Sequence, residues 1–153
     1  MKSVIYNKVL TNILLVITLL FSIQAFAKPP VYTSFFSSVA VSGYDTVAYF
    51  TESKAIKGNA QYSTEHKGVE WHFSSQANLK LFKNTPEKYT PQYGGYCAWA
   101  VAHNDTAKSD PQQWTIHNNK LYLNYNSEIQ GQWLQNKTML ITNADRYWPT
   151  LIK

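Results

Sequence analysis

Two pairs of short strand-forming segments, each pair joined by a two-residue turn, constrain the fold of this chain most. The first pair, residues 61–66 and 69–73, flanks Lys67-Gly68. Glycine readily adopts the positive φ of a tight hairpin turn, so we predict an antiparallel hairpin here. With that register one face carries Tyr62, Thr64, His66, Val69, Trp71 and Phe73, and the other carries Ser63, Glu65, Glu70 and His72.

The second pair, residues 114–117 and 120–123, flanks Asn118-Asn119. Asparagine tolerates the left-handed conformation, so this dipeptide also suits a two-residue hairpin turn. The register separates an apolar face from a second face, which supports it. The apolar face carries Trp114, Ile116, Leu121 and Leu123, and the opposite face carries His117, Lys120 and Tyr122. The core is expected to include Trp71, Phe82, Trp114 and Leu121.

Helices are predicted from N-terminal caps and from apolar residues at helical spacing. Ser75 caps the first helix, and a capping box at residues 127–130 opens the second. A third runs from about residue 138 to 148 and is ended by Pro149. Their apolar faces carry Leu79 and Phe82, then Ile129 and Trp133, then Ile141, Ala144 and Trp148. Hairpins interleaved with short helices predict an α+β fold in a single compact domain. No internal repeat is visible in the sequence.

The N-terminal residues indicate export. Lys2 and Lys8 precede an apolar run at residues 13–21, and Ala25-Phe26-Ala27 follows. A basic start, an apolar run of roughly 7–15 residues and a small-x-small site are typical of a cleavable signal peptide. A membrane anchor would need about 20 apolar residues, so we expect no membrane span after cleavage. The predicted organisation is therefore a signal peptide at residues 1–27, a peripheral lead-in at 28–42 and a folded domain at 43–151, in a periplasmic or secreted protein.

Charge excludes one class of partner. The chain has 14 Lys and Arg residues against 9 Asp and Glu, but the basic residues are scattered singly. Nucleic-acid binding usually needs a basic patch or stripe, so no nucleic acid is expected as a partner. Aromatic residues make up 15% of the chain, which indicates a well-filled core or an aromatic-lined pocket.

The single cysteine, Cys97, follows Gly94-Gly95 and precedes a further predicted short helix. Exported domains use cysteines for stability in pairs, so a lone thiol is either a packed apolar side chain or a reactive group. Backbone N–H groups in the first turn of a helix would lower its pKa and favour the thiolate. Without a second cysteine, dithiol exchange of the thioredoxin kind is excluded.

Several residues are candidates to form a site with Cys97. His103 is the candidate second metal ligand, although about 240° of helical rotation separates it from Cys97, so the helix would have to break between them. A thiolate with an imidazole suits copper, which is the metal we expect if one binds. A ligand pocket around Cys97 would be lined by Tyr44, Asp45, Gly94, Gly95, Tyr96, Trp99 and Tyr122.

The residue pattern resembles a known family. Residues 43–50 are close to the GYDPVAYF opening of secreted YHS domain-containing proteins, with Thr46 where proline is usual. The resemblance continues along most of the chain, through Gly68, Trp71, Phe73, Ser75, Phe82, Pro86 and Tyr89, then residues 93–98 and 121–126, and finally Trp148-Pro149. The chain thus resembles the secreted YHS domain-containing, or (seleno)protein-like, family.

The resemblance implies a link to heavy metals, because YHS domains are similar to small modules that bind soft metals through cysteine thiolates. Those thiolates lie in an F-C-S-x-x-C stretch, where this chain has Ser74 and Asn78 instead. We therefore expect no structural zinc. The (seleno)protein label implies redox use of a chalcogen, for which Cys97 is the candidate position.

Three functional hypotheses remain open at the level of sequence. The first is a non-catalytic exported protein that binds a soft metal ion, copper above all, or a small ligand near Cys97. The second is a redox or nucleophilic protein that uses Cys97 as its catalytic thiol. The third is an interaction module with a structural cysteine and a protein partner that the sequence does not identify.

Overall fold

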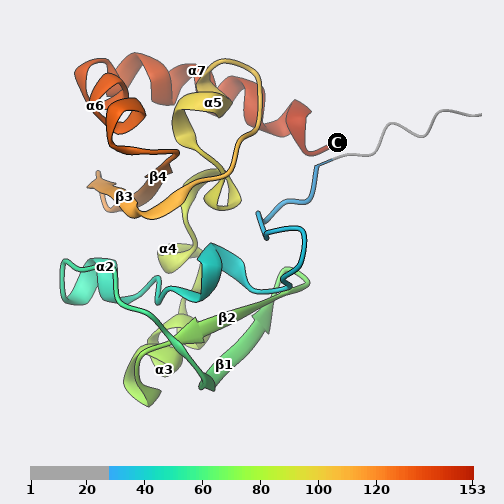
Figure 1. Cartoon of the computed structure of the whole chain (residues 1–153), viewed down its shortest axis with the longest axis vertical. Coiled ribbons are helices and arrows are strands. Elements are labelled where there is room, and N and C mark those ends of the chain that lie inside the picture. The colour runs from blue at the N-terminus through green and yellow to red at the C-terminus, as the bar shows by residue number, and fades with distance from the viewer. Residues whose placement is uncertain (1–27) are drawn as a thin grey trace, which may run out of the picture.

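The computed structural model describes residues 28–153, which form two antiparallel hairpins with short helices before, between and after them (Figure 1). The predicted signal peptide, residues 1–27, lies outside the described residues. In chain order the elements are η1 (Ala40–Gly43), α2 (Ala48–Thr51), β1 (Asn59–His66), β2 (Val69–Phe73), α3 (Gln76–Asn84), α4 (Pro86–Tyr89), η2 (Gln92–Gly95), α5 (Ala98–Ala102), β3 (Asp110–His117), β4 (Lys120–Asn124), α6 (Ser127–Gln135) and α7 (Lys137–Leu151). The predicted α+β fold is confirmed.

Both hairpins have the predicted register. His66 pairs with Val69 in β1–β2, and His117 pairs with Lys120 in β3–β4. All four turn residues, Lys67-Gly68 and Asn118-Asn119, have positive φ, as a two-residue turn of this kind requires.

The two halves of the chain have the same element order and nearly the same element lengths. The first strand of each hairpin has 8 residues, the second has 5, and the helix that follows has 9. Corresponding residues lie 51 or 52 positions apart, as His66 and His117 do. We call residues 40–89 the first unit and residues 92–151 the second unit; Figure 1 shows them in the lower and upper halves of the molecule.

Local hydrogen bonds repeat between the units as well. The N–H of Asp45 donates to Ile56 over 2.8 Å, and the N–H of Cys97 donates to Ala107 over 3.0 Å. A bulge interrupts each hairpin at the same place, before Ser63 in one and before Trp114 in the other. The structure therefore contains a repeat that is not visible in the sequence. The repeat is preserved in turns, caps and backbone bonds, whereas most side chains differ.

Two helix boundaries differ from their predictions. The N-cap of α6 is Asn126, whose extended backbone lets its Oδ1 accept from the N–H of Ile129, so the predicted cap Ser127 is already helical. Pro149 lies inside α7, which continues to Leu151. Proline removes one backbone bond, but its fixed φ is compatible with a helix, so a last turn still forms. The predicted cap Ser75 is confirmed by its bond from the N–H of Asn78.

Hairpin β3–β4 is shared between two hydrophobic clusters. Leu121 and Leu123 pack into a first cluster with Trp71 and Phe82, whereas Tyr122 packs into a second cluster with Trp133. The expected core residues Trp71, Phe82 and Leu121 are buried, and Trp114 is half-buried against the first cluster. Both faces of this hairpin are thus covered.

The lead-in, residues 28–42, was expected to be peripheral, yet it reaches the core. Val31, Ala40 and Val41 are buried, and the N–H of Tyr32 donates to the carbonyl of Gly94 over 2.9 Å. A Cβ on Gly94 would lie 1.9 Å from the carbonyl oxygen of Pro30, so only glycine permits this approach. Between residues 28 and 153, no helix combines the length and apolar character needed to span a membrane.

Candidate functional site

Asp45, a predicted pocket residue, is a fully buried carboxylate in the first unit. Its Oδ1 accepts from the backbone N–H groups of Val47 at 2.9 Å and Ala48 at 3.3 Å. Its Oδ2 accepts from the N–H of Ser74 at 2.8 Å, from the hydroxyl of Ser74 at 2.7 Å and from Nδ2 of Asn78 at 2.7 Å. These five donors satisfy the charge internally, so Asp45 joins α2, the end of β2 and α3.

Ser74 and Asn78 are the two positions at which the family resemblance implies thiolates. Both donate to Asp45, and Asn78 is buried. Since their polar groups are committed to this network, the stretch that would hold a metal in related modules here holds a carboxylate instead.

Tyr44 lies beside this network but faces the surface. The Lys57 ammonium lies 4.8 Å from the centre of its ring, and the amide of Gln112 donates to its hydroxyl over 3.2 Å. Because Gln112 belongs to β3, Tyr44 contacts the second unit.

Cys97 is buried at the N-cap position of α5. Its Sγ lies 3.8 Å from Oδ1 of Asn124, which also accepts from the N–H of Trp99 at 3.3 Å. Burial raises the pKa of the thiol, and backbone N–H groups of Ala100, Tyr125 and Trp99 offset this only in part. The expected lowering of the pKa was therefore wrong, because the cost of desolvating the thiolate exceeds the effect of these donors.

His103 lies at the other end of α5, as its C-cap. Its Nδ1 is 2.7 Å from the carbonyl oxygen of Trp99, and its exposed ring stacks on that of Trp99 with centroids 3.8 Å apart. Across residues 28–153 no three His, Cys, Asp or Glu side chains gather into a group that could hold a metal. The structure thus offers no preformed metal site that joins Cys97 and His103.

Of the remaining candidate residues, Tyr96 and Tyr122 belong to the second cluster, and Gly95 precedes Tyr96 in the chain. Tyr96 packs against Tyr32 and Trp148, with ring centroids 5.2 and 5.7 Å apart, and Tyr122 lies 5.1 Å from Trp133. The carbonyl of Gly95 accepts from the hydroxyl of Ser109 over 2.6 Å.

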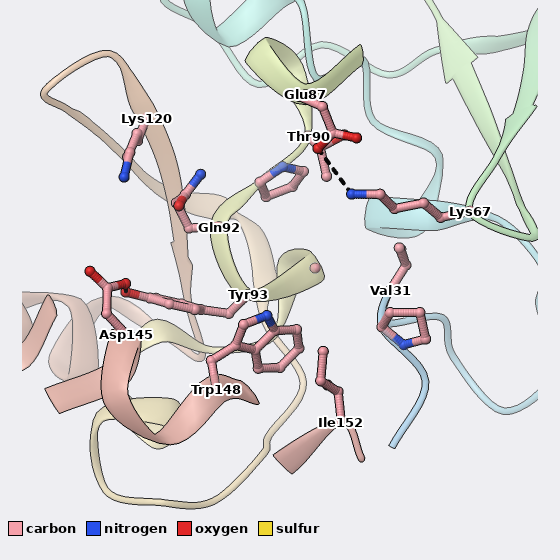
Figure 2. A pocket seen from close by; sticks show the side chains of 13 residues that line it. Val31, Lys67, Glu87, Thr90, Gln92, Tyr93, Lys120, Asp145, Trp148 and Ile152 are labelled. Carbon is pink, nitrogen blue, oxygen red and sulfur yellow. Dashed lines mark hydrogen bonds and ion pairs between the residues drawn. The ribbon is translucent and has the colours of Figure 1, made fainter. Parts of the chain in front are cut away.

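A cleft of about 470 Å³ lies at the junction of the two units and the lead-in. Its walls come from the lead-in, the turn of the first hairpin, the start of β4, the segment from α4 to η2, and the end of α7. Figure 2 shows Lys120, Gln92 and Asp145 toward one end, with Lys67 and Glu87 toward the other. Of the predicted pocket residues, Gly94 lines this cleft.

Two of the four charged side chains that line the cleft form an ion pair, and a third accepts a hydrogen bond. The Lys67 ammonium lies 3.0 Å from Glu87, and the hydroxyl of Tyr93 donates to Asp145 over 2.9 Å. Burial, followed by the hydrogen bond to Asp145, raises the pKa of Tyr93 and keeps its hydroxyl protonated. The Lys120 ammonium makes no hydrogen bond or ion pair with any side chain between residues 28 and 153.

The backbone of the cleft is strained at Tyr93. This residue has φ 54° and ψ 35°, in the left-handed region that non-glycine residues rarely adopt. Such strain persists where surrounding structure enforces it, and it is frequent at functional sites. Sequence reasoning missed Lys67, Gln92, Lys120 and Asp145, because their proximity depends on how the two units pack. The glycine pair after Tyr93 was the only local signal.

Comparison with known proteins finds one family model that matches part of the chain. The model of the YHS domain matches residues 47–93. The match lies largely in the first unit and ends at Tyr93, the second residue of the second unit. No curated protein matches the chain, and no solved structure does either.

Proposed function

We propose that this protein is an exported, non-catalytic binding domain whose cleft takes up a small polar molecule with an anionic group. The observation that carries the proposal is the ammonium of Lys120, which has no ion-pair partner among residues 28–153, in a cleft where Lys67 pairs with Glu87 and Asp145 accepts a hydrogen bond from Tyr93. An anionic group of the ligand would pair with Lys120, and Gln92 and Thr90 could supply or accept further hydrogen bonds.

The size and lining of the cleft agree with this class of ligand. Its volume falls in the range of small-molecule sites, and Trp148 and Ile152 add an apolar wall. The strained Tyr93 and the clamp between Gly94 and the lead-in preorganise one side of it, which reduces the ordering cost of binding. Because binding uses groups that are already in place, no chemical step is required of them.

A two-dimensional NMR titration tests the proposal. Acetate, succinate, citrate and phosphate are added to the labelled protein, with acetamide and succinamide as neutral analogues. We expect the anions to shift the resonances of Gln92, Gly94 and Lys120, and the neutral analogues to have little effect. Removing a charge-assisted contact typically costs about 1.5–3 kcal/mol, so Lys120→Gln should weaken binding at least tenfold.

The matched control is Lys80→Gln, which removes an exposed lysine from α3, away from the cleft. It should leave the titration unchanged. Equal weakening by both variants would indicate non-specific attraction to the basic protein, and shifts confined to other surfaces would contradict the proposed location.

A second candidate function is soft-metal binding at Cys97. The YHS match favours it, since this match supports a metal-associated small domain. The groups beside the sulfur are the amide oxygen of Asn124, which is a poor ligand for a soft metal, and backbone N–H groups, which are not ligands, so one thiolate would have to supply most of the affinity.

Titration with Cu(I) under reducing conditions decides this candidate. If Cys97 is the ligand, Cys97→Ser should lose stoichiometric binding, whereas His103→Gln should change it little because this ring is stacked on Trp99. Equal copper binding by wild type and Cys97→Ser would remove Cys97 from the metal site. An interaction module with a structural cysteine would then stand as the remaining alternative.

A further inference from the structure

The correspondence between the two units places Cys97 where the first unit has Asp45. Each residue follows a left-handed stretch and a tyrosine, Tyr44 in one unit and Tyr96 in the other. Each also donates its N–H to a carbonyl ten or eleven residues further on, in Ala107 or Ile56. The two side chains therefore start from equivalent backbone positions.

The donors around the two side chains correspond as well. Backbone N–H groups of Val47, Ala48 and Ser74 bind the carboxylate of Asp45. Backbone N–H groups two, three and twenty-eight residues beyond Cys97, in Trp99, Ala100 and Tyr125, act to lower the pKa of its thiol against the larger effect of burial. The N–H of Trp99 donates its hydrogen bond to Oδ1 of Asn124, beside the sulfur. The first two of these three N–H groups have the same spacing as in the first unit, and the third differs by one residue. Cys97 thus occupies a cradle whose counterpart holds an anion with two oxygen atoms.

A side-chain amide lies beside each of the two side chains, although Asn78 and Asn124 do not occupy corresponding positions in the two units. Nδ2 of Asn78 donates to Asp45 over 2.7 Å. In the second unit Asn124 is fully buried beside Cys97, and its Nδ2 has no hydrogen-bond partner within the described part of the chain. A buried amide with unsatisfied N–H groups is costly. Oδ1 of this amide, not Nδ2, faces the sulfur of the reduced Cys97 at 3.8 Å, so an acceptor formed at Cys97 would satisfy Nδ2 once the amide rotates.

We propose that Cys97 is a site of oxidation to the sulfinate, which the second unit binds as the first unit binds Asp45. A sulfinate on a β-carbon has two oxygen atoms and one negative charge, like the aspartate carboxylate. Its oxygens would accept from the three backbone N–H groups. Rotation of the Asn124 amide would turn Nδ2 toward one oxygen, in the role of Asn78.

The reaction requires two equivalents of hydrogen peroxide. The thiolate sulfur attacks one peroxide oxygen, the O–O bond breaks, and the sulfenic acid forms with release of water after proton transfer. The sulfenate sulfur attacks a second peroxide in the same way, giving the sulfinate and a second water. Each step oxidises the sulfur by two electrons and reduces one peroxide, and no resolving thiol exists in this chain to divert the sulfenic acid into an intramolecular disulfide.

Access to the sulfur requires a local opening, because Cys97 is only 1% exposed. The segment that covers its backbone, around Ala107, belongs to a stretch without helix or strand between α5 and β3. Oxidation should therefore be slow relative to an exposed thiol. Once formed, the sulfinate should be stable, since it is not reversed by ordinary thiol reductants.

Peptide-level mass spectrometry after exposure of the folded protein to hydrogen peroxide tests the site. The expected result is a gain of two oxygen atoms, about 32 Da, on the peptide with Cys97, and a thermal midpoint no lower than that of the reduced protein. Localisation is required because Met139 is 58% exposed and will also oxidise. Oxidation of Cys97 that unfolds the protein, or that yields only the trioxidised sulfonate, would overturn the proposal.

A pair of variants tests the cradle without oxidant. Cys97→Asp supplies the carboxylate of the first unit, and Cys97→Asn has nearly the same shape without charge. We expect Cys97→Asp to have the higher thermal midpoint. A lower midpoint for Cys97→Asp, or folding of Cys97→Asn alone, would contradict an anion-binding cradle. If neither variant folds, the oxidation experiment on the unaltered protein still decides.

Discussion

At the scale of single residues, Asp45 shows how a predicted site residue can have a structural task. Its carboxylate is buried without a cationic partner among residues 28–153, and five hydrogen bonds replace the water that it has lost. The donors come from three separate elements, so one side chain determines how they meet.

Asp45→Asn should lower the free energy of unfolding by about 3 kcal/mol. The amide nitrogen would face N–H or O–H donors and leave buried groups unsatisfied, each costing about 1–3 kcal/mol. Urea unfolding measures the loss. Glu52→Gln is the control, because Glu52 is exposed, and its midpoint should not change. A loss below about 1 kcal/mol for Asp45→Asn would show that the network relaxes around the amide.

Residue chemistry indicated which side chains are unusual, but not what surrounds them. Gly94 was predicted to line a pocket around Cys97, and in the structure the backbone of the lead-in packs against it. Lys120 was predicted only as a strand residue on the face of the second hairpin opposite its apolar face, because its place in the cleft depends on α7, which comes later in the chain.

At the scale of elements, local signals predicted the hairpins and most caps. Two-residue turns and alternating strands involve neighbours in sequence, so the registers at Lys67-Gly68 and Asn118-Asn119 followed from the residues alone. The α6 cap was misplaced by one residue because Asn126 and Ser127 are both good caps, and only the backbone conformation distinguishes them. Pro149 was given too much weight as a terminator.

At the scale of the whole molecule, the shared hairpin joins two clusters that the sequence did not separate. The register correctly placed Leu121 and Leu123 on one face, but the burial of Tyr122 on the other face depends on Trp133 and α7. The repeat itself was missed because equivalent positions hold different side chains, such as Asp45 and Cys97.

Because of this sharing, Leu121→Ala should destabilise both units together. Truncating a buried leucine typically costs about 2–5 kcal/mol. Hydrogen exchange resolved by residue should then accelerate equally in α3 of the first unit and α7 of the second. The control Leu134→Ala changes a side chain that is 42% exposed and should have a small effect. Acceleration confined to α3 would show that the units open independently.

The shared hairpin also has a consequence for the order of events during synthesis. The chain is made from its N-terminus, so the first unit is complete in sequence well before Leu121 and Leu123 are added. Until then its cluster lacks two fully buried side chains and stays open to solvent. Stable folding therefore has to wait for the last third of the chain, and until it is made the nascent protein remains in a state that could still be threaded through a narrow channel.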